Sequence, residues 1–373
     1  TLKASGNLNV TLKDDFQNLN DVVVIGYGSA KAKDLTSPIT VVKAADIKST
    51  PSSSPMTALQ GKVAGVNVVS SGTPGAGPTV RIRGTGSFAN SSPLYVVDGM
   101  FYDDINFLNN EDIQEMSILK DASAAAIYGV RAANGVVIIT TKKGTKNQKA
   151  QITYDGYIGF QKATNVLEMA NSQEYATMLM EANYDAYSPT MKAAIDRFGG
   201  SYADSDFHKW TYGADTDWYK ELLRTAVITN HSVGISGGSD KATYSLGISY
   251  LYQDGIMDTD NNYKRLNFRA AVDYDATSWL KVGFNGVFSK SDQVLPNNAA
   301  WQQAFNTPGI IPVFDEQNAQ AFPDKYATPS SVGLSTNFKN PVATAKYYDA
   351  KNELRQYMTN FYAQINLLSL IHI

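Results

Sequence analysis

The sequence predicts a small N-terminal α/β domain followed by the first strands of an antiparallel transmembrane β-barrel. Residues 59–144 contain short β-rich runs and an Ala-rich segment bounded by Gly, Pro, Asn or Asp, which is typical of a small α/β domain. From residue 150 on, several segments alternate apolar and polar residues, as strands do when one face contacts lipid. Tight turns and long connections alternate between these segments, which is the arrangement of outer-membrane barrels.

The α/β domain should contain five short strands and two short helices. Asp121 is placed to cap an Ala-rich helix, and Gly129 to end it in a left-handed conformation. Ser54, followed by Pro55, should cap a second helix that carries Leu59 and that Gly61 terminates. The strands are expected at residues 39–42, 63–70, 80–83, 94–97 and 136–141.

About six strands are expected in the second part of the chain. Residues 238–241 and 275–278 form tight turns, whereas residues 163–229 and 292–353 are long, polar and rich in aromatic residues. If the first strand rises from the periplasm, both tight turns lie on the periplasmic side and both long segments lie outside. A soluble β-sandwich does not require this segregation. The alternating segments are 152–160, 231–236, 243–252, 265–274, 280–289 and 357–365.

The composition excludes some classes of protein without choosing between a barrel and a soluble β-rich protein. Charged residues make up 18% of the 373 residues, below the roughly 25% that is usual in soluble proteins. No stretch approaches the roughly 18 apolar residues of a membrane helix. The chain has no cysteine, which excludes disulfides and thiolate chemistry, and its net charge of −3 argues against a nucleic-acid-binding surface.

Catalytic and metal-binding motifs are incomplete. The residues from Gly234 to Gly238 match a nucleophile elbow around Ser236, but they precede a strand instead of a helix. Gly61 and the lysine after it lack the Ser or Thr of a P-loop. The three histidines are scattered, and the acidic segment 254–262 lacks the Gly and distal Glu of an EF-hand, which favours a solvated turn. We therefore expect no enzyme activity, no cofactor and no metal.

Five motifs of the α/β domain carry a resemblance to a known family. They read LQGKVAGV from Leu59, RIRG from Arg81, PLYVVDG from Pro93, LKDASAAAIYG from Leu119 and RAANGVVIITTKKG from Arg131. Their content and order resemble the plug domain of the SusC/RagA-like TonB-dependent outer-membrane transporters. The residues of this plug signature are Leu59, Gln60, Gly61, Arg81, Arg83, Gly84, Asp98, Gly99, Lys120, Asp121, Tyr128, Gly129, Arg131, Asn134 and Gly135.

The resemblance implies an order of domains. Residues 1–20 resemble the end of a carboxypeptidase-regulatory-like β domain, residues 21–33 a TonB box with its linker, and residues 34–149 the plug. Residues 150–366 would be the first strands and outer loops of a barrel, which closes with about 22 strands in plugged transporters. Residues 367–373 lose the alternation. We therefore interpret the sequence as a fragment with a non-native-looking tail.

An apolar segment before the plug is the candidate TonB box. A short β-branched run is most often a core strand, but the polar stretch 29–37 suggests no partner hairpin nearby. A free extended segment can add as an edge strand to the sheet of another protein. The resemblance assigns this role to a segment that the inner-membrane transducer TonB would grip, with the residues Asp21, Val22, Val23, Val24, Ile25, Gly26, Tyr27 and Gly28.

The resemblance implies active import across a Gram-negative outer membrane. The cargo would be oligosaccharides or, as in RagA-like members, peptides, which a SusD-like lipoprotein helps to capture. Two alternatives stay open. One is uptake of a siderophore or cobalamin by the same architecture, and the other is a non-transporting β-rich surface receptor or adhesin.

Two groups of side chains are candidates for specific roles. Arg81 and Arg83 are expected to meet carboxylates at the interface of plug and barrel, in wet polar contacts that let the plug be remodelled. The alternative is a solvated surface. Trp210, Trp218 and Trp301 lie in the long outer segments and are candidates for ligand contact, with an interfacial girdle or a loop core as the alternative.

Overall fold

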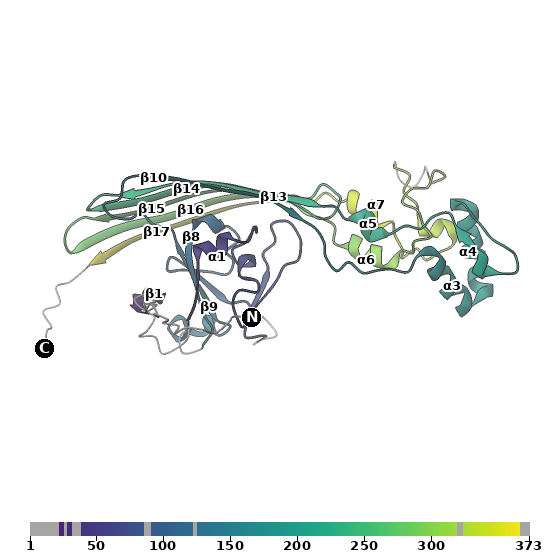
Figure 1. The fold of residues 1–373 in the computed structure, drawn as a ribbon, viewed down its shortest axis with the longest axis horizontal. Coiled ribbons are helices and arrows are strands. Elements are labelled where there is room, and N and C mark those ends of the chain that lie inside the picture. The colour runs from purple at the N-terminus through teal and green to yellow at the C-terminus, as the bar shows by residue number, and fades with distance from the viewer. Residues whose placement is uncertain are drawn as a thin grey trace, which may run out of the picture.

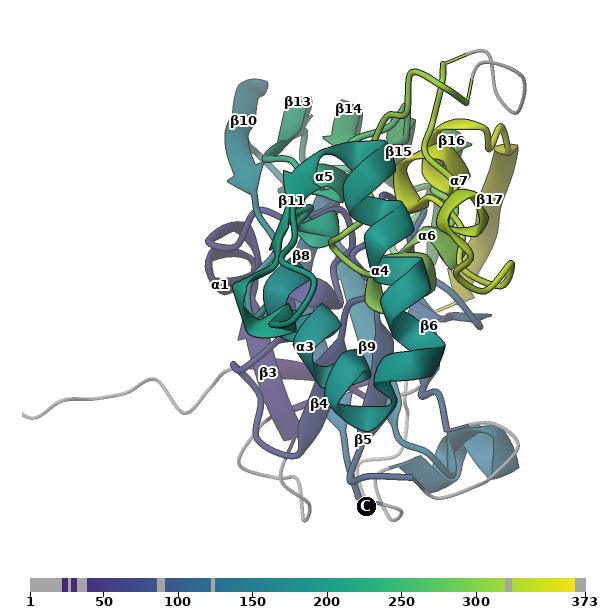
Figure 2. The ribbon, with the colours of Figure 1, turned by 90° about the vertical axis from the view of Figure 1, so that its right-hand side faces the viewer.

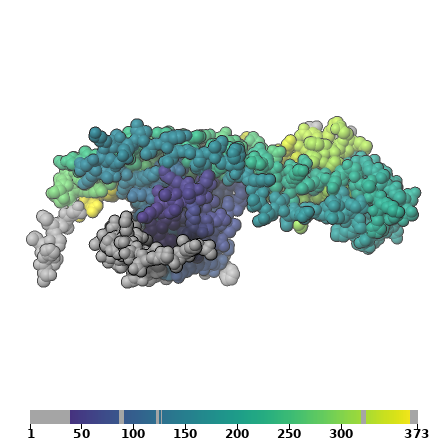
Figure 3. Space-filling view, in the orientation of Figure 1, coloured from purple at the N-terminus to yellow at the C-terminus, as the bar shows by residue number. Residues whose placement is uncertain are grey.

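The computed structural model describes residues 22–25, 28–31, 39–85, 91–121, 125–318 and 324–365. A long curved sheet runs along the molecule, the α/β domain packs against one face of this sheet, and a cluster of helices lies beyond one of its ends (Figure 1). The space-filling view shows the α/β domain directly against the sheet, while the helical cluster projects away from both (Figure 3). The α/β domain and the sheet therefore share one large interface.

The α/β domain is built on a five-stranded sheet in the order β3-β8-β9-β6-β7. β6 and β9 are parallel, and the other neighbours are antiparallel. The strands are β3 (Ile39–Lys43), β6 (Leu94–Val97), β7 (Met100–Tyr102), β8 (Ile113–Leu119) and β9 (Val136–Thr141). The domain is completed by the pair β4 (Val66–Val69) and β5 (Thr79–Ile82) and by α1 (Ala44–Lys48), η2 (Thr57–Leu59), η3 (Asn110–Asp112) and η4 (Ala126–Ala132).

The α/β domain folds around an apolar core of its own. β6 is buried along its whole length and β9 nearly so, as is usual for strands covered on both faces. From the long sheet, buried Val287 joins this core and Met358 packs against it. The fully buried side chains of the core include Ile47, Leu59, Leu108, Met116, Ile118, Val137 and Ile139.

The structure confirms most of the expected strands of this domain and corrects its helices. β6 and β9 have the predicted bounds, whereas β7 and β8 were not predicted. Gly129 has the expected positive φ of 68°, but it interrupts η4 instead of ending a helix. The second helix is a single 3-10 turn that begins at Thr57, so Ser54 is not its N-cap.

The long sheet has six antiparallel strands in the order β10-β13-β14-β15-β16-β17. Each of the six alternating segments of the sequence forms one strand, and the turns after Gly238 and Asp275 are short, as expected. The strands are β10 (Gln151–Gln161), β13 (Ala226–Gly238), β14 (Ala242–Asp254), β15 (Asn262–Asp275), β16 (Leu280–Val294) and β17 (Lys351–Ile365).

The two faces of this sheet differ in polarity. The outer face, turned away from the α/β domain, exposes large apolar side chains. The inner face, turned toward the α/β domain, buries polar ones. Exposed apolar residues include Ile152, Tyr154, Ile158, Phe160, Phe268, Tyr357 and Phe361. Buried polar residues include Asn230, Ser232, Ser245, Arg265, Asn267, Arg269 and Ser289. This polarity is the reverse of a soluble sheet and fits a sheet with lipid outside.

The two long connections fold together into the helical cluster (Figure 2). The sequence predicts these connections as polar loops, so their helices are a correction. An Asn171–Glu174 capping box starts α3, and buried Met191 and Ile195 help form the core of the cluster. Its helices are α3 (Ser172–Ala182), α4 (Tyr184–Phe198), η5 (Phe207–Lys209), α5 (Trp218–Leu222), α6 (Ala299–Asn306), η6 (Pro329–Val332) and α7 (Pro341–Lys346). In the described part of the chain, no helix is long and apolar enough to cross a membrane.

The candidate TonB box forms a strand that already has a partner. β1 (Val22–Ile25) pairs antiparallel with β2 (Gly28–Lys31), so the expectation that no partner hairpin lies nearby is wrong. Asp21, Gly26 and Tyr27 lie outside the described residues, as do the segments 1–20 and 367–373.

Gly135 provides a test of the α/β packing. Its φ is +91°, and an added Cβ would lie 2.9 Å from Ile82 Cδ1 and 3.2 Å from Ile82 Cβ. Gly135→Ala therefore combines backbone strain of about 1–2 kcal/mol with overpacking of about 1–3 kcal/mol. We expect a loss of about 2–5 kcal/mol in the free energy of unfolding of this domain, measured by hydrogen exchange of β6 and β9 in the full-length protein.

Gly61→Ala is the matched control, because Gly61 has a φ of +74° and nothing lies within 4 Å of its added Cβ. Gly61→Ala should cost only the backbone strain of about 1–2 kcal/mol. Equal losses in the two variants would contradict the packing described here.

Candidate functional site

The interface between the α/β domain and the inner face of the sheet is predominantly polar. We call these contacts the polar seam. A run of four consecutive buried polar residues in and before η3 lies at its centre, which is unusual because charged side chains are rarely buried without partners. The seam comprises Lys48, Asn109, Asn110, Glu111 and Asp112 of the α/β domain and Asp155, Asn230, Arg265, Asn267 and Arg269 of the sheet.

A buried ion pair joins η3 to β15. Arg269 Nε donates to Asp112 Oδ1 at 2.9 Å, and the two side chains are only 4% and 8% exposed. The other guanidinium nitrogens donate to the Lys142 carbonyl oxygen at 2.6 Å and to Ser245 Oγ at 2.9 Å. These bonds use three nitrogens of the planar guanidinium group, which point in fixed directions. The single ammonium of a lysine could not reproduce them.

A second ionic contact joins α1 to β10. Lys48 Nζ lies 2.7 Å from Asp155 Oδ2 and 2.8 Å from Glu111 Oε2. Burial lowers the pKa of Lys48, but its hydrogen bonds to Asp155 and Glu111 outweigh burial and raise the pKa above its ordinary value. The ammonium therefore stays charged and bridges the sheet to two elements of the α/β domain.

The remaining contacts of the seam run mainly from side chains of the sheet to backbone carbonyls of the α/β domain. Arg265 donates to the carbonyl oxygens of Ser53, at 3.0 Å, and Asn106. Asn267 Nδ2 donates to the Phe107 carbonyl oxygen at 2.7 Å. Such bonds fix the position of the domain and depend little on its side chains.

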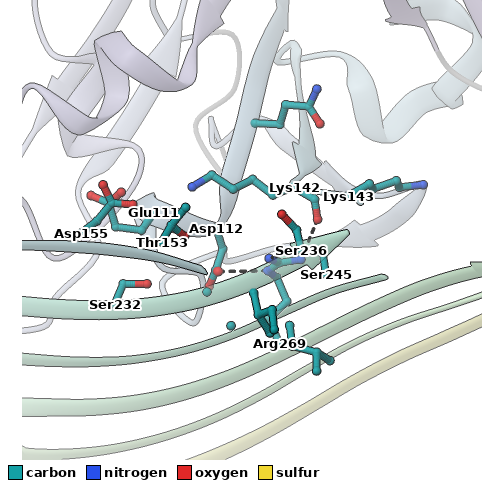
Figure 4. A pocket seen from close by; sticks show the side chains of 15 residues that line it. Glu111, Asp112, Lys142, Lys143, Thr153, Asp155, Ser232, Ser236, Ser245 and Arg269 are labelled. Atoms are coloured by element: carbon teal, nitrogen blue, oxygen red, sulfur yellow. Dashed lines mark hydrogen bonds and ion pairs between the residues drawn. The ribbon is translucent and has the colours of Figure 1, made fainter. Parts of the chain in front are cut away.

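The seam encloses a cavity of about 260 Å³ that is lined mainly by polar groups (Figure 4). Several buried polar atoms near the seam have no hydrogen-bond partner in the described part of the chain: Asn109 Nδ2, Asn110 Oδ1 and Asn230 Oδ1. A polar cavity of this size has room for several waters, although Asn109, Asn110 and Asn230 do not line it. The interface is thus built to be wet, and it lacks the continuous apolar packing of a core.

Lys142 projects into this cavity. Figure 4 shows its side chain directed toward the end of the cavity that holds Glu111 and Asp155. Burial, together with the nearby charge of Lys48, holds the pKa of Lys142 below its ordinary value, and the carboxylates of Asp155 and Glu111 act in the opposite direction. Lys142 is therefore a partly desolvated cation beside two carboxylates.

Most residues of the plug signature stabilise the α/β domain itself. Asp98 holds β9, because its carboxylate accepts from Thr141 N at 3.0 Å and from Thr141 Oγ1 at 2.6 Å. Lys120 Nζ donates to the Ala64 carbonyl oxygen at 3.1 Å. The Gly135 carbonyl oxygen accepts from Leu94 N at 3.0 Å. Asp98, Lys120 and Gly135 thus each bind another segment of the same domain.

The structure does not support the expectation for Arg83, and the expectation for Arg81 stays a prediction. Arg83 lies just after β5 with a φ of +59° and pairs with Asp121 of the same domain. Arg81 is exposed. Ionic contacts with the sheet are made instead by Asp112 with Arg269, by Lys48 with Asp155 and by Lys146 with Asp275, so polar contacts of the expected kind are present through other residues.

The three candidate tryptophans lie in or against the core of the helical cluster. Trp210 and Trp218 are 1% and 3% exposed, and Trp218 Nε1 donates to the Pro308 carbonyl oxygen at 3.2 Å. Trp301 is partly buried and stacks on Tyr219, with ring centroids 6.3 Å apart. The alternative of a loop core describes Trp210 and Trp218 in this structure.

Sequence reasoning did not identify Lys48, Asp112 and Arg269. One signal was available, because Arg265, Asn267 and Arg269 alternate with apolar residues on a strand and so share its polar face. Their partners lie more than 150 residues away in the chain, and no spacing rule reaches that far. Among the described residues, no three His, Asp or Glu side chains are grouped to hold a metal.

Arg269→Met tests the buried ion pair. It leaves Asp112 buried without its charged partner, which typically costs about 3–5 kcal/mol. We expect that loss in the free energy of unfolding of the α/β domain, measured by denaturant titration of the full-length protein. Adding Asp112→Leu to the same variant should restore much of the loss.

Arg131→Met is the matched control, because Arg131 and Asp103 form an ion pair whose side chains are 57% and 93% exposed. Exposed pairs contribute about 0–1 kcal/mol. A loss for Arg269→Met no larger than for Arg131→Met would show that the buried pair does not hold the domain.

Comparison with known proteins places this arrangement in a family. Residues 31–136 match the family model of the TonB-dependent Receptor Plug Domain. The chain is 33% identical over 355 residues to the TonB-dependent receptor SusC of Bacteroides thetaiotaomicron, which covers 91% of this chain and 33% of SusC. It is 34% identical over 369 residues to a TonB-dependent receptor of Formosa agariphila, which covers 96% of this chain and 34% of that receptor. The chain thus spans about a third of the length of these curated relatives.

Solved structures give the same result. The RagAB peptide importer in its open-open state superposes with a TM-score of 0.73 at 28% identity, over 94% of this chain and 41% of the importer chain. Its closed-closed state gives a TM-score of 0.70 at 29% identity, over 90% of this chain and 40% of the importer chain. The chain therefore belongs to the SusC/RagA-like TonB-dependent receptors, which are outer-membrane proteins.

Proposed function

We propose that the full-length protein imports nutrients across the outer membrane in a TonB-dependent manner. The α/β domain, residues 34–149, acts as the plug of a barrel of about 22 strands, of which the six-stranded sheet is one part. The observation that carries the proposal is the polar seam. A wet, ion-paired interface holds the plug against the wall, and water can replace most of its bonds when the two surfaces separate.

TonB would act on the segment 21–28. β1 and β2 form a hairpin, so TonB must add to a free edge of this hairpin or displace one of its strands. The chain then continues to β3, which is an edge strand of the plug sheet. A pull on the hairpin therefore loads the N-terminal side of the plug first.

The cargo we propose is an oligosaccharide or a peptide, delivered with a SusD-like lipoprotein. Similarity to the RagAB peptide importer supports the peptide class, and the oligosaccharide class rests on the resemblance of the plug motifs to the SusC/RagA-like family. The helical cluster supports a role outside the barrel, because it is a folded unit with its own core at the end of the sheet opposite the tight turns (Figures 1 and 2). Such a unit offers a rigid surface to a partner.

Val23→Pro tests the coupling. Proline removes a backbone N–H and fixes φ, so it should prevent strand addition at β1. We expect energy-dependent uptake to fall to the level of cells treated with a proton uncoupler, while substrate binding at the cell surface is retained. Uptake is measured in cells that carry the complete gene, across a panel of oligosaccharides and peptides.

Val23→Thr is the control, because threonine keeps the N–H and the β-branched shape. This variant should import at a rate close to that of the unmodified protein. Unchanged uptake by Val23→Pro would refute the role of this segment. Binding without any uncoupler-sensitive uptake by the unmodified protein would instead indicate a surface receptor.

A further inference from the structure

The two ends of the plug are attached to the sheet in different ways. At the N-terminal end, β3 is an edge strand that leads directly into α1, and the Lys48 contact ties α1 to the sheet. At the C-terminal end, the backbone itself is clamped to the sheet. An added Cβ on Gly144 would lie only 2.4 Å from the Tyr244 carbonyl oxygen, and the Gln148 carbonyl oxygen accepts from Gly238 N at 2.9 Å. A pull from the N-terminus therefore moves Lys48 before it moves the residues after β9.

Lys142 lies at the C-terminal end of the plug, where the backbone is held against the sheet. It follows β9 directly, and its neighbours at 144–148 are held by the turn between β13 and β14. Its backbone is fixed as well, because Lys142 N donates to the Asp112 carbonyl oxygen at 2.9 Å and its own carbonyl oxygen accepts from Arg269. When α1 leaves the seam, Lys142 stays in place.

Lys48 and Lys142 both lie beside the carboxylates of Glu111 and Asp155. Lys48 binds Glu111 and Asp155 in the resting structure, and the Lys142 side chain points toward them across the cavity (Figure 4). Within the described residues, the Lys142 ammonium forms neither an ion pair nor a hydrogen bond. Lys143, next to it, instead lies over the Tyr362 ring, 5.8 Å from the centroid. Lys142 is thus a second cation beside two carboxylates whose charge Lys48 already neutralises.

Departure of Lys48 would leave two carboxylates facing each other in the seam. The Glu111 side chain is 7% exposed, and a buried charge without a charged partner is strongly disfavoured. Arg269 is held by Asp112, Ser245 and the Lys142 carbonyl oxygen, and each of its three nitrogens makes one of these bonds. Lys142 lines the same cavity as Glu111 and Asp155 and, in the described part of the chain, has no ion-pair partner of its own.

We propose that Lys142 is the second partner of Glu111 and Asp155 and takes over these carboxylates when the β3–α1 segment, residues 39–48, leaves the seam. The event that removes Lys48 from the seam rests on the proposed TonB-coupled function. The exchange of lysines requires only that Lys48 is lost. The exchange keeps the rest of the plug neutralised and attached through Lys142 and Arg269. The moving part of the plug is then its N-terminal segment, and β6, β8 and β9 stay in the barrel.

Carbodiimide cross-linking of the purified full-length receptor tests the exchange, because this reagent joins a lysine to a carboxylate that it touches. The unmodified protein should give links from Lys48 to Asp155 or Glu111, identified by mass spectrometry. Lys48→Met should increase links from Lys142 to the same two acids several-fold. Lys143→Met is the matched control and should leave both sets of links unchanged.

Unchanged Lys142 links in Lys48→Met would overturn the proposal. If Lys48→Met does not fold, the more polar Lys48→Gln is used under the same criterion. A second readout is the denaturation midpoint. The double variant Lys48→Met/Lys142→Met should lower the denaturation midpoint by more than the sum of the two single changes, because in each single variant the remaining lysine can still pair with the carboxylates. Additive shifts would also overturn the proposal.

The cross-linking experiment contains no TonB, so its outcome is separate from that of the uptake experiment. If Lys48→Met shows no increase in Lys142 links while Val23→Pro loses uptake, only the proposed role of Lys142 is refuted. Observed exchange together with normal uptake in Val23→Pro would remove only the TonB-coupled function.

Discussion

The ion pair between Asp112 and Arg269 is the interaction on which the arrangement of the plug and the sheet depends. Replacing a buried ion pair with apolar residues of similar size is often neutral or stabilising, so this pair is poorly explained by stability alone. Its value lies in orientation and reversibility. A fork of donors from β15 fixes the position of η3, and water can replace each of its bonds when the surfaces separate.

The same logic explains where the apolar residues lie. The plug keeps its own core behind the seam, and the helical cluster keeps another beyond the end of the sheet. The long sheet has no comparable core, because it buries polar groups on the inner face and exposes apolar ones on the outer face. Among the described residues, the plug core includes only Val287 and Met358 from the sheet, so most of each unit's apolar packing lies within that unit. The proposed transport function would require this separation.

The sequence predicts the regular parts of this structure and misses those that depend on distant contacts. The alternation of β10 and of β13 to β17, and the apolar runs of β6 and β9, are local signals, and the structure confirms them. β2 reads GSAK, which has weak β-propensity, so its pairing with β1 was missed. The helices of the two long connections bury their apolar residues against one another in a shared core. Lys48 and Asp112 find their partners 107 and 157 residues away, which no periodicity reveals.

A reversible disulfide between the plug and the sheet tests the central claim most directly, namely that transport requires the N-terminal side of the plug, including the residues that follow α1 up to Pro51, to move away from β10. A Cβ built on Gly159 of β10 lies 3.9 Å from Pro51 Cβ, within the range of disulfides, and this chain has no cysteine of its own. The oxidised Pro51→Cys/Gly159→Cys variant should bind substrate but not import it, and reduction should restore import. Undiminished import by the fully oxidised variant would contradict the account.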